Sequence, residues 1–433
     1  MAEHNLPGEL AAFLAEREDE LIAFRRDLHA HPELGYREHR TTTRVALRLA
    51  AAGLRPATLP KGTGLVADID GGGPGGQIVA LRADLDALPI TDEKNVPYRS
   101  TTPGVCHACG HDVHTTVLLG AGLFLARQAA AGQLPGRVRL IFQPAEEIPG
   151  GALDVMAAGG IASVSRIFAL HCDPRLDAGK VGTRTGSITA ACDKIKVRVT
   201  GPGGHTARPH LTADLVYALG KIVTELPAAL SRRVDPRSSL SLVWGKVTAG
   251  SAANAIPDEG IAEGTVRCLD DQAWHEAPDL FKSLIESVAS AYGVNAELQY
   301  ERNVPPTVND PVSTAILETA ASQVLGADAV CPTPQSLGGE DFAWYVESIP
   351  GTLARLGTRT PGSAEDFDIH QPTFDVDERA IGVGVQLMAA TAITALHAET
   401  PANGTARASA VGGVKPPRQP PSEAQGRARI SAT

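Results

Sequence analysis

The segment Cys106-His107-Ala108-Cys109-Gly110-His111-Asp112-Val113-His114 holds six potential metal ligands in nine residues. An apolar, strand-like run precedes it and a long, helix-like run follows it. Thiolate and imidazole groups bind borderline metals such as Zn²⁺, and carboxylates suit harder ions. The segment predicts a metal site between a strand and a helix. The alternative is a buried cysteine beside an unrelated histidine at the start of a helix.

Strand and helix patterns alternate on both sides of this segment. Helical spacing covers residues 21–29 and 40–52, and residues 112–130 form a long apolar helix, as does the shorter run 381–396. Strands are expected at the following runs: 66–70, 77–82, 138–143, 167–170 and 353–356. Strands that alternate with helices indicate an α/β fold with helices on both faces of a mostly parallel sheet.

Polar side chains come directly after several of these apolar strands. They are Asp84 and Asp86, the adjacent acids Glu146 and Glu147, and His171. In open α/β sheets the ligand crevice lies beyond the carboxyl ends of the strands. Three separate runs therefore deliver carboxylates and imidazole to one edge of the sheet.

The pattern changes near residue 190. From there a strand, a helix, two strands, a helix and a strand follow one another, which is a split βαβ arrangement. We interpret residues 190–307 as an inserted βαββαβ, ferredoxin-like satellite domain, and residues 1–189 with 308–400 as the metal-bearing domain. Residues 401–433 carry almost no large apolar side chains and are predicted to be a disordered tail.

The overall composition narrows the classes of function. The net charge is −10 and no basic stripe is visible, which argues against a nucleic-acid partner. The sequence shows no run of about eighteen apolar residues, so we expect no membrane-spanning helix. The first seventeen residues lack an export-signal pattern, and six cysteines are few for a chain of 433 residues, so we expect reduced thiols and a cytoplasmic protein.

The acidic pair Glu146-Glu147 allows two interpretations. Two acids at a strand end are most often solvated or lie at a helix N-terminus. In the functional interpretation, the side chains of neighbouring extended residues diverge, so one holds a metal while the other faces a substrate. A carboxylate beside a metal-bound water can act as a general base.

Together these motifs resemble the M20 metallopeptidase family, and in particular its amidohydrolase branch of hippurate hydrolases, N-acyl-amino-acid deacylases and auxin-conjugate hydrolases. The resemblance covers about residues 20–396. It rests on runs that occur in this order: Arg25-Arg26-Asp27-Leu28-His29-Ala30-His31-Pro32-Glu33-Leu34, Leu81-Arg82-Ala83-Asp84-Leu85-Asp86-Ala87-Leu88-Pro89, His107-Ala108-Cys109-Gly110-His111-Asp112-Val113-His114-Thr115, Phe142-Gln143-Pro144-Ala145-Glu146-Glu147, Gly201-Pro202-Gly203-Gly204-His205, Asn254-Ala255-Ile256-Pro257-Asp258, Gly339-Glu340-Asp341-Phe342 and Ile369-His370.

The resemblance implies a metal-dependent amidohydrolase that cleaves N-acyl amino acids, with two divalent ions (Zn²⁺ or Mn²⁺, alternatively Co²⁺ or Ni²⁺). It implies Glu146 as general base, Asp86 as the residue that orients a ligand, and His205 and Asn254 as substrate or oxyanion contacts. It also implies a homodimer formed through the satellite domain. The implied metal ligands are Cys109, His111, Glu147, His171 and His370.

Three alternatives remain open from the sequence. Cys109 could be the nucleophile of a thiol hydrolase, the protein could bind metal without catalysis, or it could be an aminopeptidase or carboxypeptidase. The sequence also departs from its relatives beside the site. Ile148-Pro149 follows the acidic pair where relatives usually have glycine, and Cys172 follows His171 at a variable position.

Overall fold

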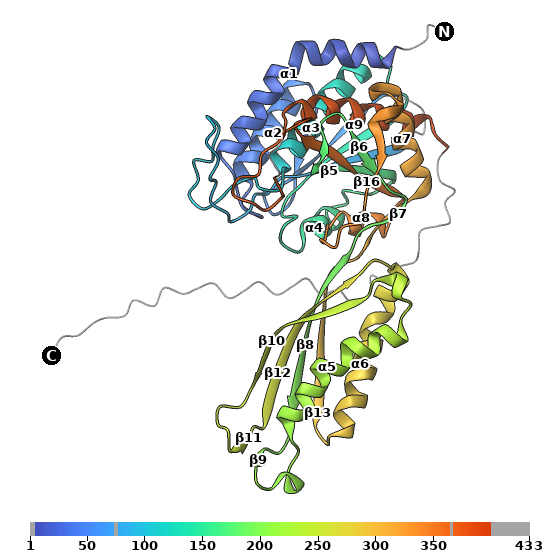
Figure 1. Cartoon of the computed structure of the whole chain (residues 1–433). Helices are drawn as coiled ribbons and strands as arrows, with labels where there is room; N and C mark the ends of the chain where they lie inside the picture. The colour runs from blue at the N-terminus through green and yellow to red at the C-terminus, as the bar shows by residue number, and fades with distance from the viewer. Residues whose placement is uncertain (1–4, 73–76, 364–366, 400–433) are drawn as a thin grey trace, which may run out of the picture.

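The computed structural model describes residues 5–72, 77–363 and 367–399 and contains two main sheets (Figure 1). The larger sheet has eight strands in the order β1-β2-β4-β3-β5-β16-β6-β15. Their bounds are β1 Ala57–Thr58, β2 Leu65–Asp70, β3 Ile78–Asp84, β4 Arg137–Gln143, β5 Val164–Asp177, β6 Val181–Thr183, β15 Val330–Pro332 and β16 Gly351–Arg359. The predicted tail, 401–433, lies outside the described residues.

The centre of the larger sheet is parallel. Strands β4, β3, β5 and β16 run in one direction, and antiparallel pairs occur toward the edges, between β1 and β2, β2 and β4, and β16 and β6. Every residue of β3 is buried, as a strand covered on both faces requires. The predicted α/β class with a mostly parallel sheet is therefore confirmed.

Helices cover both faces of this sheet. Side chains of β3 alternate between two cores: Val79 and Leu81 pack in the core with α1, α3 and α9, whereas Ile78 and Ala80 pack with α4 and α8. The helices of this part are α1 Leu6–Ala30, α2 His39–Ala51, α3 His111–Ala130, α4 Gly151–Ala157, α7 Pro311–Leu325, α8 Ala343–Val346 and α9 Arg379–His397. Helix α9 is long and apolar enough to cross a membrane, but 72% of its most apolar window is buried inside the fold.

Two elements extend beyond their predicted bounds. Strand β5 runs from Val164 to Asp177, so His171 lies inside the strand and not after it, because pairing with β16 continues as far as Asp177. Helix α1 begins at Leu6, well before residue 21, because the side chain of Asn5 accepts a hydrogen bond from the amide of Gly8 and caps the helix. Tertiary pairing and an early cap thus override the local pattern.

The second sheet is antiparallel, with the order β10-β12-β8-β13. Its elements follow the predicted order of strand, helix, strand, strand, helix, strand. They are β8 Ala191–Thr200, α5 Leu215–Arg233, β10 Ser241–Ala249, β12 Glu259–Cys268, α6 Asp271–Ala291 and β13 Asn295–Val304. Helix α5 is capped by Asp214, whose side chain accepts a hydrogen bond from the amide of Tyr217. The assignment of residues 190–307 as a separate domain stays a prediction.

The chain enters and leaves the second sheet side by side. Strand β7 (Gly186–Thr189) pairs with β14 (Thr307–Asn309), and the hydroxyls of Thr189 and Thr307 are 2.6 Å apart. At the far end of this part, β9 (Gly204–His205) pairs with β11 (Ala255–Ile256) (Figure 1). The short 3₁₀ helices are η1 Pro209–Leu211, η2 Pro236–Ser238 and η3 Ala327–Ala329.

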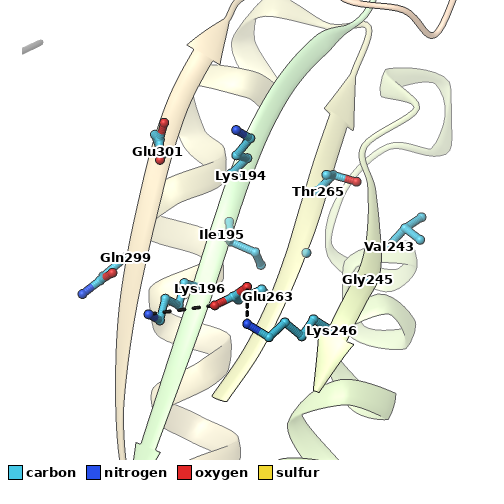
Figure 2. A pocket seen from close by; sticks show the side chains of 11 residues that line it. Lys194, Ile195, Lys196, Val243, Gly245, Lys246, Glu263, Thr265, Gln299 and Glu301 are labelled. Atoms are coloured by element: carbon cyan, nitrogen blue, oxygen red, sulfur yellow. Dashed lines mark hydrogen bonds and ion pairs between the residues drawn. The ribbon is translucent and has the colours of Figure 1, made fainter. Parts of the chain in front are cut away.

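One face of the second sheet is covered by α5 and α6, and the other is open to solvent (Figure 2). On β8, the buried Ile195 alternates with Lys194 and Lys196, which line a hollow on the open face. There Glu263 of β12 forms ion pairs with Lys246 at 3.3 Å and Lys196 at 3.9 Å. On this face the charge of Glu263 is matched by lysines of neighbouring strands, beside the exposed side chain of Val243.

Candidate metal centre

Five side chains that the sequence predicts as metal ligands gather at the carboxyl edge of the larger sheet. Ligand atoms of Cys109, His111 and His171 lie within 4.8 Å of one another, and so do those of Cys109, Glu147 and His370. The residues come from distant segments: the loop before α3, the first turn of α3, the turn after β4, the middle of β5 and the loop before α9. The structure brings all five together, and their roles as ligands stay predictions.

The closest contacts join the two ends of the cluster. Sγ of Cys109 is 3.5 Å from Nε2 of His171, and Nε2 of His370 is 3.2 Å from Oε1 of Glu147. Nε2 of His111 lies between them, at 3.9 Å from carboxylate oxygens of both Glu146 and Glu147. The acidic pair therefore faces the imidazoles and is not simply solvated.

The backbone near the cluster adopts unusual conformations that aim these side chains. Gly110 caps α3 with φ 85°, and a Cβ at this position would approach Sγ of Cys172 to 2.8 Å. Glycine thus permits the sharp turn that separates Cys109 from His111. Ala145, with φ 51°, makes the corresponding turn after β4, and its amide donates to Oε1 of Glu38 at 2.8 Å.

Asp86 organises the acidic pair and one imidazole at once. Its two oxygens accept hydrogen bonds from the amides of Glu146 and Glu147, both at 3.0 Å, and Oδ1 lies 3.3 Å from Nδ1 of His111. Nδ1 of His171 similarly donates to the carbonyl of Cys172 at 2.8 Å. In both histidines the bonded Nδ1 leaves Nε2 directed toward the cluster, as in metal-binding histidines with a supporting partner.

The cluster has the unmet bonding capacity that a cation would satisfy. Nε2 of His111 is buried and, among the residues that the structure describes, makes no hydrogen bond; the buried Oε1 of Glu147 makes none either, although Nε2 of His370 lies 3.2 Å from it. Buried polar atoms without hydrogen bonds are rare and costly in native proteins. Sulfur, imidazole nitrogen and carboxylate oxygen together suit divalent ions such as Zn²⁺. The residues present therefore fit a divalent metal site.

Two neighbouring side chains, Asp84 and His114, lie beside this site and support it. Asp84 lies close enough to His111 and His114 to suggest another ligand group. Oδ1 of Asp84, however, is 2.6 Å from Nδ1 of His114, and Oδ2 accepts from Arg82 at 2.7 Å. Nε2 of His114 accepts from the amide of Cys172 at 2.8 Å. These atoms are already engaged, so Asp84 and His114 brace the cluster.

The electrostatics of the cluster argue against a thiolate nucleophile. Burial, together with Glu147 and Glu146, holds the pKa of Cys109 well above its usual range. A catalytic cysteine needs a lowered pKa. Burial also keeps the pKa of His171 well below its usual range, so its imidazole is neutral and able to bind a metal. Burial alone would lower the pKa of His111, but Asp84, Asp86 and Glu147 raise it to about 10.

A cavity of about 400 Å³ opens over the cluster, in the size range of small-molecule sites. Four of the candidate ligands line it with Glu146, and residues of the second sheet form the opposite wall. These second-sheet residues are Cys192, Lys194, Arg267, Asn303 and Val304. The cavity thus lies between the two sheets.

His205 and Asn254 are not part of this cavity. They lie at the far tip of the second sheet, where the amide of Thr206 donates to the carbonyl of Asn254 at 3.3 Å (Figure 1). Nδ1 of His205 accepts from the amide of Ala207 at 3.1 Å, and both side chains are exposed. The structure brings them together with each other but not with the metal cluster, and their role toward substrate stays a prediction.

The motif-based prediction missed Arg355 and the positive groups opposite it, Lys194 and Arg267, all of which line the cavity. It also gave no role to Arg82, which is buried and donates to Asp84 and to Asp341. The available signal was an arginine inside an otherwise apolar strand pattern, since such a residue needs a partner or a function.

The α/β fold and the candidate metal cluster of sulfur, nitrogen and oxygen atoms are features of a metal-dependent hydrolase, the class that the following comparisons support. A family model described as Peptidase family M20/M25/M40 matches residues 80–394, so the chain belongs to this family. A solved structure of a dinuclear metal binding peptidase of the M20 family from Bacillus subtilis is 35% identical, with a TM-score of 0.78, and the match covers 90% of this chain and 99% of the other. Divalent metal ions as cofactors are thereby supported.

The relatives of this chain are named for different activities. The N-acetyl-L-cysteine deacetylase of Bacillus subtilis is 39% identical over 370 residues, which are 85% of this chain and 86% of that protein. Thermostable carboxypeptidase 1 of Saccharolobus solfataricus is 34% identical over 395 residues, 90% of this chain and 98% of that protein. A Rhodococcus jostii protein named for glutamate–cysteine ligase activity is 50% identical, but the match spans 86% of this chain and 46% of that protein, less than half its length.

Proposed function

We propose that this protein hydrolyses the amide bond of small N-acyl amino acids and releases a carboxylic acid and a free amino acid. The observation that carries the proposal is the carboxylate of Glu146, 9% exposed, beside a cluster of five candidate ligands in a cavity of about 400 Å³. A protein that only stored metal would have no use for this carboxylate. Similarity to relatives named as deacetylases supports an acylated amino acid as substrate.

The five clustered residues, Cys109, His111, Glu147, His171 and His370, would hold two divalent ions, Zn²⁺ or Mn²⁺. When bound, such ions polarise an amide carbonyl and lower the pKa of water, which makes hydrolysis feasible near neutral pH. Softness of the Cys109 sulfur favours Zn²⁺ over harder ions. The six cysteines, all free in the structure, support a reducing and hence cytoplasmic setting.

Glu146 is the proposed general base. Its Oε2 faces Nε2 of His111 at 3.9 Å, and Asp86 fixes its amide at 3.0 Å. Burial, with the nearby carboxylates Glu340 and Glu147, holds the pKa of Glu146 well above its usual range. A carboxylate of raised pKa takes a proton from water more readily and can then pass it to the leaving amine nitrogen.

Carboxypeptidase activity is the second candidate, because relatives with that name match nearly the whole chain. A carboxypeptidase cleaves the same kind of bond, since the acyl group is then a peptide. The two candidates differ in the acyl side: a deacylase accepts acetyl or benzoyl groups, whereas a peptidase needs a further residue. Parallel assays on N-acetyl amino acids and on free dipeptides separate them.

For His205 and Asn254 we infer a role that needs either a second copy of the chain or a different placement of the second sheet. Both residues are exposed at its tip, away from the cavity. A homodimer through the second sheet is the form we propose. Light scattering of the purified protein measures the oligomeric state, and a monomer that keeps full activity would contradict the dimer.

The proposed function is tested by assaying metal-reconstituted protein on N-acetyl, N-benzoyl and N-indole-acetyl amino acids. We expect release of free amino acid that is abolished by EDTA and restored by Zn²⁺ or Mn²⁺. A thiol hydrolase would instead survive EDTA and lose activity with iodoacetamide. If reconstituted protein releases no amino acid from any member of the panel, the proposal fails.

A further inference from the structure

Arg355 is a buried cation inside the cavity. It lies in the middle of β16, is 7% exposed, and follows the buried Leu353 and Ala354. It lines the same cavity as Cys109 and His171. Among the residues that the structure describes, no hydrogen bond or ion pair involves its guanidinium, although burial normally requires an arginine to be paired.

The pairing of the sheet directs Arg355 toward the cluster. Parallel pairing of β16 with β5 sets Arg355 opposite His171, and residues in register on neighbouring strands present their side chains on the same face. On the other side, Arg355 is opposite Gly182 of β6. A Cβ at Gly182 would lie 3.2 Å from Cβ of Arg355 and 2.9 Å from Cβ of Thr333, so glycine keeps space free beside the arginine.

The nearest acids do not neutralise Arg355, because each is engaged elsewhere. Glu340 pairs with Arg82 at 3.1 Å, and Asp173 pairs with Arg175 at 2.8 Å. Both acids act on Arg355 electrostatically but form no ion pair with it. A desolvated guanidinium of this kind is stabilised by an anion that enters the cavity.

We propose that Arg355 binds the carboxylate of the amino-acid part of the substrate and so selects acylated amino acids with a free carboxyl group. The inference rests on the proposed function, which supplies a substrate with that carboxylate. The guanidinium presents paired N–H donors in a plane that match the two carboxylate oxygens. Holding this end of the substrate would fix the position of its amide bond relative to Glu146.

Two other cations line the cavity, and the structure favours Arg355 over both. Lys194 is exposed, and Arg267 already donates to the carbonyl of Leu337 at 3.1 Å. Both come from the second sheet, on the wall opposite the cluster. Arg355 is the buried cation of the three, so pairing with a carboxylate gains most there, where the effective dielectric constant is lowest.

The test measures binding, so that it does not depend on turnover. The metal-loaded Glu146→Gln variant is titrated by calorimetry with N-acetyl-L-alanine and with N-acetyl-L-alaninamide, which lacks the carboxylate. Adding Arg355→Gln is expected to weaken binding of the acid by about 30-fold or more and to leave binding of the amide unchanged. Arg355→Lys, which keeps a charge, should recover part of the affinity. Arg359→Gln is the matched control, since Arg359 ends the same strand but is exposed and paired with Asp177.

Three outcomes would overturn the proposal: equal binding of acid and amide before Arg355 is changed, equal loss of both ligands in Arg355→Gln, or no loss of either. Metal content and thermal unfolding of each variant show whether a loss comes from damage to the site. The proposed function fails separately, if the parent enzyme hydrolyses no N-acyl amino acid. Even then, carboxylate-selective binding that depends on Arg355 would support its role in binding the carboxylate.

Discussion

The two sheets of this protein use charge in opposite ways. At the carboxyl edge of the larger sheet, carboxylates, imidazoles and a thiol lie together and are mostly buried, His370 excepted, and two of their atoms lack hydrogen bonds among the described residues. On the open face of the second sheet, Glu263 is partly exposed between two lysines that match its charge (Figure 2). Burial of unmatched ionisable groups is costly and marks chemistry, whereas matched surface pairs contribute little.

The largest effect is expected from Glu146→Gln. This change removes the proposed base and keeps the shape of the side chain, so turnover should fall by roughly 10²–10⁴-fold. Metal content, measured by elemental analysis, should equal that of the parent because Glu146 is not among the proposed ligands. Turnover close to the parent value would show that another group takes the proton.

The next effect is expected from Cys109→Ser, which removes the soft ligand. Metal affinity should fall by at least about tenfold, since even the loss of a supporting partner has an effect of that size. Elemental analysis after dialysis against a limited Zn²⁺ concentration measures it. Cys331→Ser is the control, because Cys331 lies in the edge strand β15, away from the cluster. Unchanged metal content in Cys109→Ser would refute its role as a ligand.

Asp86→Ala tests the support beneath the cluster. The change removes the acceptor for the amides of Glu146 and Glu147 and the partner of His111. We expect a loss of about 10–100-fold in metal affinity or activity, as for other residues that orient ligands. Metal titration and steady-state kinetics measure the two quantities. Parent-like values in both would mean that the cluster holds its geometry without Asp86.

Asp193 is a buried acid in the second sheet. The effect of its titration on stability tests the contrast between the two sheets. Burial raises its pKa to about 6, although Asn303, Tyr300 and Trp274 donate hydrogen bonds to it. The unfolded chain releases this proton near 3.8, so the folded state binds more protons between these values. The contribution of Asp193 to stability should therefore fall by roughly 2 kcal/mol as pH rises from 4 to 7.

The measurement for Asp193 is thermal or urea unfolding of the parent and of Asp193→Asn at pH 4 and pH 7. Because asparagine does not titrate, the difference in stability between the two proteins should shift in favour of the variant at the higher pH. Other titrating groups cancel in this comparison. A difference that is the same at both pH values would contradict the raised pKa.

The smallest effect is expected from Glu263→Gln on the open face of the second sheet. The side chains of Glu263 and Lys246 are 37% and 59% exposed, and ion pairs of this kind contribute less than about 1 kcal/mol. Melting temperature, metal content and turnover should all stay close to the parent values. A large loss of turnover would show that the open face takes part in the reaction.

The sequence predicts the architecture well where pattern and partner are local. Period-two and helical spacing locate β3, β4, α3 and the order of strands and helices along residues 190–307, and polar residues after apolar strands locate the cluster. The pattern fails where distant segments decide. Asp173 and Pro174 argue locally for the end of a strand, yet β5 continues past them because β16 pairs with it. Whether His205 reaches the cluster depends on how the two sheets are arranged, and a local motif carries no information about that.

Arg355 shows a second limit of the same kind. In the sequence it is one basic residue in the run Leu353-Ala354-Arg355-Leu356, with no motif around it. Its meaning depends on which acids come close to it after folding and on whether those acids are already paired. Only the three-dimensional structure shows which acids lie near Arg355 and which of them already form ion pairs.

The left-handed backbone of Ala145 has a consequence for how this enzyme would respond to selection for heat resistance. A residue other than glycine at φ 51° costs about 1–2 kcal/mol, and this turn presents Glu146 and Glu147. Glycine would remove that cost but would make the backbone more flexible, so the side chains of Glu146 and Glu147 would be held less firmly in place. A library screened for thermostability alone would thus tend to select glycine at position 145 and make the turn before the acidic pair more flexible. Because the proposed hydrolysis depends on that turn, such a screen should also assay activity.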